Sequence, residues 1–133
     1  MNHLKVKKIV INIFKNFKLK EAHAKISAEY LIKAELLGAP SHGLARLKMY
    51  CKRLNKKIIN PNPKIKIKKI SQSISHIDAN NSIGFVAADL GIKIAIKNAK
   101  KTGIGLVAIK NSGHYGLSSF YAEQAVKKKL MVL

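Results

Sequence analysis

The fold of this chain is decided by residues 106–116, which read LVAIKNSGHYG. Residues 106–109 form a short continuous apolar run, typical of a buried β-strand, and residues 117–128 have the pattern of a helix. In open α/β sheets, ligands bind in the crevice at the carboxyl ends of the strands. This stretch therefore predicts an α/β fold in which the loop carrying His114 borders a binding site.

A second polar segment, residues 40–46, reads PSHGLAR and also places a histidine beside a glycine. Apolar residues at helical spacing predict a helix over residues 22–37, which the glycine and proline that follow it bring to an end. We expect Ser41 to cap a second helix. The apolar stripe of that helix would be Leu44, Leu47, Cys51 and Leu54. His42 and Arg46 would then be neighbours on one helix face, at positions i and i+4.

The middle of the chain predicts the rest of the sheet. Alternating lysine and isoleucine over residues 64–68 favour a half-buried edge strand, and a second short strand follows at 73–77. Residues 78–82 have the composition of a turn and helix start, and the helix after them closes at Gly103. The apolar residues 130–133 resemble the start of a further strand. We therefore expect the chain to be the front part of a longer protein.

The predicted fold class is α/β, with N-terminal helices followed by a mixed sheet with helices. These elements divide the chain into two segments. Residues 1–60 form an N-terminal helical segment that carries the Ser-His-Gly motif. Residues 61–133 form the first part of an α/β domain with the Asn-Ser-Gly-His loop, incomplete at its C-terminus.

The basic composition is a poor guide to function in this chain. The formal net charge is +20 over 133 residues, but 24 of the 26 basic residues are lysine. Base and phosphate recognition relies on the planar arginine fork, so a nucleic-acid-binding protein should have kept more arginine. We interpret most of the lysines as solvated surface residues and expect no nucleic-acid partner. Because lysine is so strongly preferred in this chain, we expect Arg46 to have a role that lysine cannot fill. Arg53 has the pattern of a surface residue.

Several other classes of protein are excluded by pattern. A single cysteine, Cys51, rules out an internal disulfide framework and suits a reducing compartment, and no apolar run is long enough to span a bilayer. We expect a cytoplasmic protein without a membrane segment. No spacing fits a metal site, and no G-x-S-x-G elbow surrounds a serine. Residues 103–108 match the letters of a dinucleotide fingerprint but follow a helix and precede a strand, which is the wrong context.

The polar residues that remain fit the oxidation of a small 2-hydroxy acid. Arg46 could hold the substrate carboxylate through two parallel hydrogen bonds. His114, as the catalytic base, could take the hydroxyl proton while a hydride leaves for a nicotinamide. His42 and Ser41 would hydrogen-bond the carboxylate or carbonyl oxygen. Spacing alone leaves two plainer alternatives open, in which His42 caps a helix start and His114 only stabilises its loop.

The same residues carry a resemblance to a known family. Residues 34–47, AELLGAPSHGLARL, with Tyr50 and the Ile-Asn-Pro run at 59–61, resemble the N-terminal signature of the type 2 malate/L-lactate dehydrogenase family. That family also includes ureidoglycolate and sulfolactate oxidoreductases. Residues 78–80 and 111–116 resemble the family's stretch that ends in its catalytic histidine loop. The chain departs from the pattern at Lys56-Lys57, where a glycine is usual, and at Gly113, where asparagine is common.

The resemblance implies a family-specific α/β fold distinct from the Rossmann domain, a homodimer, and NAD or NADP as cofactor. It places the proton-transfer histidine on His114 and the substrate-side residues on Ser41, His42 and Arg46. Family members are more than twice as long, and most of their cofactor contacts lie outside the part matched here. Two other functions stay open: an inactive remnant or one piece of a split gene, and a lysine-rich module that binds nucleic acid or other anions.

Overall fold

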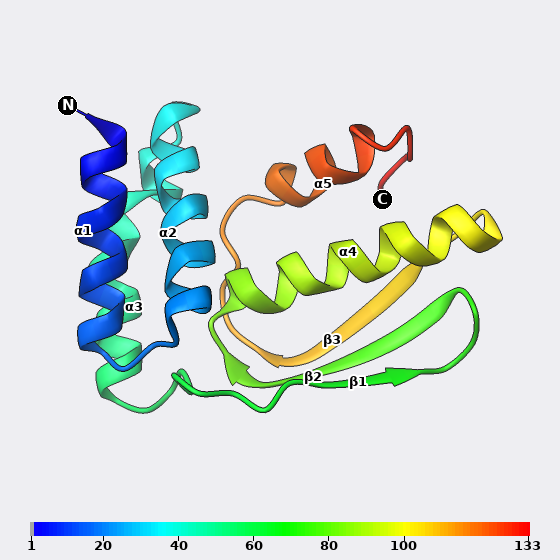
Figure 1. Ribbon diagram of the computed structural model, residues 1–133, viewed down its shortest axis with the longest axis horizontal. Helices are drawn as coiled ribbons and strands as arrows, with labels where there is room; N and C mark the ends of the chain where they lie inside the picture. The colour runs from blue at the N-terminus through cyan, green and yellow to red at the C-terminus, as the bar shows by residue number, and fades with distance from the viewer. Residues whose placement is uncertain (1) are drawn as a thin grey trace.

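The computed structural model describes residues 2–133. A group of three helices stands beside a three-stranded sheet, a fourth helix lies over one face of that sheet, and a fifth lies beyond the fourth (Figure 1). The first group contains α1 (His3–Asn16), α2 (Glu21–Leu36) and α3 (Leu47–Asn55). The sheet contains β1 (Lys66–Lys69), β2 (Ile74–Ser82) and β3 (Leu106–Ser112). It is covered by α4 (Gly84–Thr102), and α5 (Ser119–Val126) packs on α4. The predicted order of helices followed by a mixed sheet with helices is confirmed.

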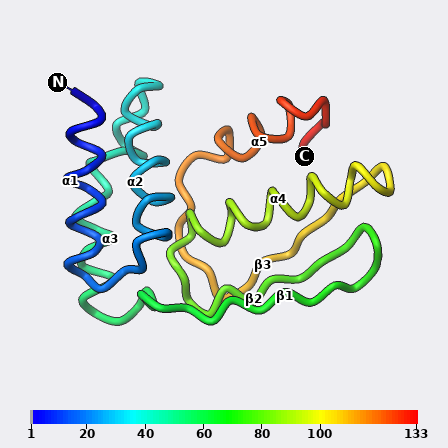
Figure 2. The backbone as a smooth tube through the Cα atoms, in the orientation of Figure 1, coloured from blue at the N-terminus to red at the C-terminus, as the bar shows by residue number. Residues whose placement is uncertain are grey.

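The sheet has the order β1-β2-β3, with an antiparallel and a parallel pair. β1 pairs with β2 in the antiparallel sense, so that Ile67 lies opposite Ile77. β2 and β3 are parallel, and α4 forms the crossover between them, as the path of the backbone in Figure 2 shows. Ile77 and Ala79 are fully buried on the face that α4 covers. Because β2 and β3 are parallel, the C-terminal end of β3 lies at the same end of the sheet as the start of α4.

One apolar core joins the helical segment to the sheet segment. Phe14 of α1, Leu31 of α2, Phe85 of α4 and Phe120 of α5 are all at most 1% exposed and belong to one cluster. Tyr30 stacks on Phe85 with ring centroids 5.7 Å apart. The relative position of α2 and α4 is therefore set by packing of large side chains, which is rigid because protein interiors are close-packed.

The helix α1 was not predicted from the sequence. It begins where the Asn2 side chain accepts hydrogen bonds from the backbone N–H groups of Leu4 and Lys5. Its buried face consists of Val10 and Phe14, which are four residues apart and therefore point the same way. In residues 2–133 no helix has the length and apolar character needed to cross a membrane.

The predicted single helix beginning at Ser41 is wrong. The chain forms two short 3₁₀ turns, η1 (Pro40–His42) and η2 (Leu44–Arg46), before α3 begins at Leu47. Between the turns Gly43 has φ −95° and ψ −135°, which is not a helical conformation. His42 and Arg46 therefore do not lie at i and i+4 on one helix, although the fold still brings their segment into a common site.

Residues 78–82 are strand rather than the predicted turn and helix start. Asp78 pairs with both neighbouring strands, and Ser82 pairs with Ser112 of β3 across a register shift. Asn80 and Asn81 have positive φ values of 50° and 56°, which asparagine tolerates better than most residues. The polar composition that suggested a turn belongs to this irregularity in β2.

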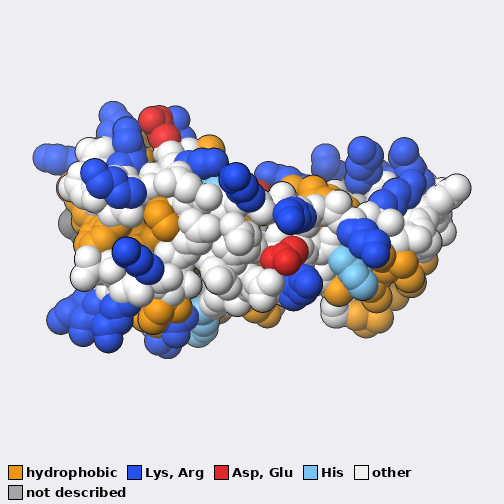
Figure 3. Space-filling model, turned by 90° about the horizontal axis from the view of Figure 1, so that it is seen from below, with side chains coloured by type: hydrophobic (Ala, Val, Ile, Leu, Met, Phe, Trp, Pro, Cys, Tyr) orange, Lys and Arg blue, Asp and Glu red, His pale blue; other side chains and the backbone are white. Residues whose placement is uncertain are grey.

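The expectation that β3 is a buried strand is wrong as well. Leu106 is 52% exposed and Ile109 36% exposed, because β3 is an edge of the sheet with no further strand beyond it in the described chain. The predicted strand at 130–133 is not formed, and the side chains of Met131 and Leu133 are exposed. Viewed from below, lysine and arginine side chains are scattered over the surface beside exposed apolar areas (Figure 3).

Candidate active site

The two histidine loops that the sequence singles out meet in the structure. The ring centroids of His42 and His114 are 6.1 Å apart, and the ring planes differ by 26°. His42 is the last residue of η1, whereas His114 lies in the coil between β3 and α5. Both side chains are half-buried. Each imidazole therefore has part of its surface available to a bound molecule.

Arg46 and Ser41 lie next to this pair. Nε of Arg46 donates a hydrogen bond of 2.7 Å to the backbone carbonyl oxygen of Ser41. Ser41 Oγ and Nδ1 of His42 are 3.1 Å apart and share a hydrogen bond. Among residues 2–133, no carboxylate lies within ion-pair distance of Arg46. The two terminal nitrogens of the guanidinium are thus free to bind a planar anion.

The Ser-His-Gly loop is held by a carboxylate from α2. Oε1 of Glu35 accepts a hydrogen bond of 2.6 Å from the backbone N–H of Leu44. A Cβ atom added to Gly43 would lie 2.3 Å from the same oxygen. Only glycine therefore lets the carboxylate come this close, and the contact fixes the turn that carries His42 and Arg46.

The His114 loop is fixed by two contacts with neighbouring elements. The side-chain amide of Asn111, a residue with φ 53°, donates a 2.9 Å hydrogen bond to Oδ1 of Asp78. That amide is the main reason why the pKa of the Asp78 carboxyl is lowered. At the start of α4, a Cβ atom on Gly84 would lie 2.3 Å from the carbonyl oxygen of His114. The first turn of α4 therefore packs directly against the backbone of the loop.

Tyr50 is a site residue for which the sequence predicted no role. Its hydroxyl lies 2.7 Å from Nδ1 of His114 and shares a hydrogen bond with it. The side chain is 1% exposed and packs against Phe85 with ring centroids 5.1 Å apart. A tyrosine on the buried face of a helix needs a partner for its hydroxyl, and that requirement is the signal that could have identified it.

The side chains that act electrostatically on His114 are all basic. Burial lowers the pKa of His114 most, and the basic groups of Arg46, His42 and Arg53 lower it further. Burial also raises the pKa of Tyr50 well above its usual value, in spite of the opposing charges of Arg46 and Arg53. Near neutral pH the imidazole of His114 is therefore uncharged and the phenol of Tyr50 is protonated. Such an imidazole can accept a proton from a bound ligand.

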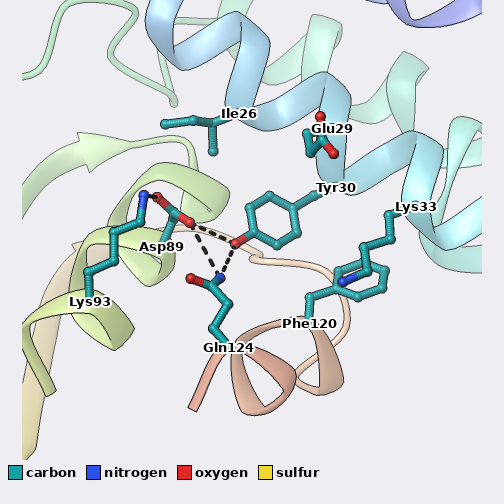
Figure 4. Close-up of a pocket in the computed structure, with 8 residues that line it drawn as sticks. All are labelled: Ile26, Glu29, Tyr30, Lys33, Asp89, Lys93, Phe120 and Gln124. Carbon is teal, nitrogen blue, oxygen red and sulfur yellow. Dashed lines mark hydrogen bonds and ion pairs between the residues drawn. The ribbon is translucent and has the colours of Figure 1, made fainter. Parts of the chain in front are cut away.

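A cavity that neither histidine lines lies between α2, α4 and α5. It has a volume of about 250 Å³ and is lined by Tyr30, Asp89 and Gln124, among others (Figure 4). Its polar groups satisfy one another, since the Tyr30 hydroxyl donates to Asp89 at 2.8 Å and Gln124 donates to Tyr30 at 2.8 Å. Lys93 pairs with Asp89 at 2.6 Å. This network attaches α5 to the helices beneath it and so anchors the far end of the His114 loop.

Residues 2–133 contain no cluster of metal-binding side chains, and the glycines at 103 and 105 do not form a dinucleotide-binding turn. No group of three His, Cys, Asp or Glu side chains gathers in residues 2–133. Gly103 ends α4 with φ 82°, and a Cβ atom on Gly105 would lie 2.0 Å from the carbonyl oxygen of Ala95. These glycines therefore close a helix and allow β3 to start against it. They do not form the strand–loop–helix turn that holds a pyrophosphate, so this stretch does not fit a nicotinamide dinucleotide.

A free guanidinium beside a neutral histidine has the chemistry of an acid–base site for a small carboxylic acid. Comparison with known proteins identifies the family to which the chain belongs. The chain matches the family model described as malate/L-lactate dehydrogenase over residues 1–133, and it belongs to this family. The family resemblance noted in the sequence is thereby confirmed.

Similar proteins include L-sulfolactate dehydrogenase of Methanocaldococcus jannaschii, which is 38% identical over 94% of this chain and 36% of its own length. Malate dehydrogenase of Pyrococcus abyssi is 38% identical over 92% of this chain and 34% of its own length. The structure of malate dehydrogenase from Pyrococcus horikoshii superimposes with a TM-score of 0.91 at 35% identity, over 95% of this chain and 36% of that chain. The chain thus spans about a third of the length of these relatives and shares their fold over that part.

Proposed function

We propose that this chain provides the proton-transfer and carboxylate-binding part of an NAD(P)-dependent oxidoreductase that acts on a small 2-hydroxy acid of the malate or lactate type. The observation that carries the proposal is the meeting of the His42–Arg46 segment with His114. The names of the relatives add support, since they include malate, sulfolactate and ureidoglycolate dehydrogenases, the last named as NAD(+)-dependent.

Arg46 is the proposed binding group for the substrate carboxylate. Its Nε is occupied by the carbonyl oxygen of Ser41, which fixes the plane of the guanidinium. The two terminal nitrogens then form a fork that matches the two carboxylate oxygens. His42 and the hydroxyl of Ser41 lie beside this fork and would donate to the carboxylate or to the oxygen on the neighbouring carbon.

His114 is the proposed proton carrier. In the direction of oxidation, its neutral imidazole accepts the proton of the substrate hydroxyl, and in the reverse direction it returns this proton to the carbonyl oxygen. A nicotinamide, when bound, supplies the hydride acceptor. The contacts to NAD or NADP are not assigned to any residue of this chain, because the stretch with the letters of a dinucleotide fingerprint, residues 103–108, lies between a helix and a strand.

The assembly and location of the protein are also proposals. We propose that the working unit is a homodimer in the cytoplasm, where the lone thiol of Cys51 stays reduced. The division of the chain at residue 60 also remains a proposal. Because the chain spans about a third of its relatives' length, we propose that the polypeptide alone neither binds NAD(P)H tightly nor turns over. NAD-dependent oxidation of malate or lactate by the purified chain would contradict this last point.

The proposal is tested by titrating the purified chain with malonate, a dicarboxylate that cannot be oxidised in this way. The ring resonances of His42 and His114 should shift together in NMR spectra. Arg46→Lys should weaken malonate binding by about 5- to 30-fold, because the charge stays while the fork is lost. Arg53→Lys is the matched control and should bind as the wild type does. Equal losses in the two variants would contradict the proposed task of Arg46.

A second candidate function has one observation in its favour. On the outer side of α3 a groove of about 530 Å³ is lined by four cationic side chains: Lys48, Lys52, Arg53 and Lys56. In residues 2–133 none of the four is ion-paired. An anion-binding module would use this groove, and its binding of DNA or RNA would fall steeply with salt. Gel-shift assays across a salt series distinguish this alternative from the enzyme.

A further inference from the structure

Tyr50 makes one hydrogen bond, and that bond is to the proposed proton carrier. Its hydroxyl shares a 2.7 Å hydrogen bond with Nδ1 of His114 and has no other partner among residues 2–133. The ring cannot easily move away, because it is buried and packs against Phe85 at the start of α4. Arg46 immediately precedes α3 and lies one helical turn before Tyr50. The charge of Arg46 also acts on both Tyr50 and His114, so an anion bound to Arg46 would lie close to both groups.

We propose that Tyr50 is a positioning residue, which holds Nδ1 of His114 so that Nε2 is the ring nitrogen that exchanges a proton with the ligand. This inference rests on the proposed function, and it adds the atom through which the proton moves. Tyr50 also determines which nitrogen of the neutral imidazole carries the hydrogen.

A phenol can hold Nδ1 in either state of the ring because it both donates and accepts. In the ligand-free protein the tyrosine hydrogen has only Nδ1 as acceptor, so the neutral ring carries its own hydrogen on Nε2. That tautomer cannot take up a proton at Nε2. A carboxylate bound at Arg46 offers the tyrosine hydrogen a second acceptor. The ring hydrogen then moves to Nδ1 and is donated to the tyrosine oxygen, which leaves a lone pair on Nε2.

The proton that the substrate hydroxyl loses is taken up by His114. The O–H bond of the substrate breaks as the Nε2–H bond forms, and His114 becomes an imidazolium. Its Nδ1–H continues to donate to the oxygen of Tyr50, so that Tyr50 itself neither gains nor loses a proton. The other titratable or charged groups around the ring are His42, Arg46 and Arg53, all basic, so no carboxylate of residues 2–133 competes for Nδ1.

The test is NMR of the full chain labelled with ¹⁵N at histidine, since ring nitrogen shifts report both tautomer and protonation. In the wild type without ligand, His114 should carry its hydrogen on Nε2, with Nδ1 in a hydrogen bond. Saturation with malonate should move the neutral ring toward the Nδ1–H form. Tyr50→Phe should abolish this change and lower the pKa of His114, because a charge-assisted bond to the imidazolium is lost. Tyr115→Phe, which removes an exposed hydroxyl, is the matched control and should behave as the wild type.

Two results would overturn the inference: a pKa of His114 in Tyr50→Phe equal to that in Tyr115→Phe, or a malonate response that survives in Tyr50→Phe. If Tyr50→Phe does not fold, the ligand-free tautomer of the wild type decides, because a ring with its hydrogen already on Nδ1 contradicts the inference. Failure of malonate to bind would count against the proposed function. The pKa comparison needs no ligand and would still test Tyr50.

Discussion

The sharpest structural prediction concerns Gly84, where the sheet crossover meets the His114 loop. In Gly84→Ala the new Cβ atom would lie 2.3 Å from the carbonyl oxygen of His114 and 2.4 Å from that of Gly113. Both neighbours are backbone atoms and cannot rotate away. The loop must therefore move by about 1 Å to reach an ordinary carbon–oxygen contact of roughly 3.3 Å. Overpacking of this kind costs about 1–3 kcal/mol, from which the better helix propensity of alanine recovers at most about 1 kcal/mol.

Urea denaturation of the purified chain measures this cost. Gly113→Ala is the matched control, because a Cβ atom there would meet no atom within 4 Å and the change lies in the same loop. We expect the control to stay within about 0.5 kcal/mol of the wild type. Displacement of the loop should also separate the two histidine rings, and NMR contacts between His42 and His114 should weaken in Gly84→Ala alone. Equal stability and equal contacts in both variants would refute the argument that this glycine sets the position of His114.

Further predictions concern the Ser-His-Gly loop and the pH dependence of stability. Glu35→Ala leaves the N–H of Leu44 without its 2.6 Å partner and should cost about 1–3 kcal/mol in urea denaturation, whereas a cost near zero would show that the loop holds itself. Hydrogen bonds from Lys127 and Lys33 lower the pKa of Glu123 from 4.5 to about 2. Because the folded-state pKa is the lower one, this stabilisation is present above pH 4.5 and is lost as the pH falls toward 2. Glu123→Gln should therefore lose less stability than the wild type between pH 5 and 2 in thermal melts; parallel curves would contradict the assignment.

The spacing of apolar residues and glycines along the sequence was enough to predict most of the helices, strands and loops that surround the candidate site. The helix over residues 22–37, the strand after Gly105 and the loop at 111–116 follow from apolar spacing and from glycine positions, and the structure contains all three. What the pattern did not predict depends on contacts between distant residues. The break at Gly43 follows from the approach of Glu35, and the exposure of β3 follows from its place at the sheet edge.

The residues of the candidate site also fall into those that the sequence predicted and those that it did not. Ser41, His42, Arg46 and His114 were predicted because each stands in a polar segment rich in glycine, where packing does not account for it. Tyr50 lies in an apolar helix, and its partner is 64 residues away. Its contact with His114 therefore has no counterpart in sequence spacing. The tasks given to these five residues remain predictions until ligand binding and proton transfer are measured.

The central claim is that the guanidinium of Arg46 and the imidazole of His114 act on one bound acid. The most direct measurement is the pKa of His114 by NMR in the wild type and in Arg46→Gln. After burial, Arg46 has the largest effect in lowering this pKa, so its removal should raise the pKa of His114 and should also abolish malonate binding. A pKa that does not change, together with malonate binding that survives, would contradict the account.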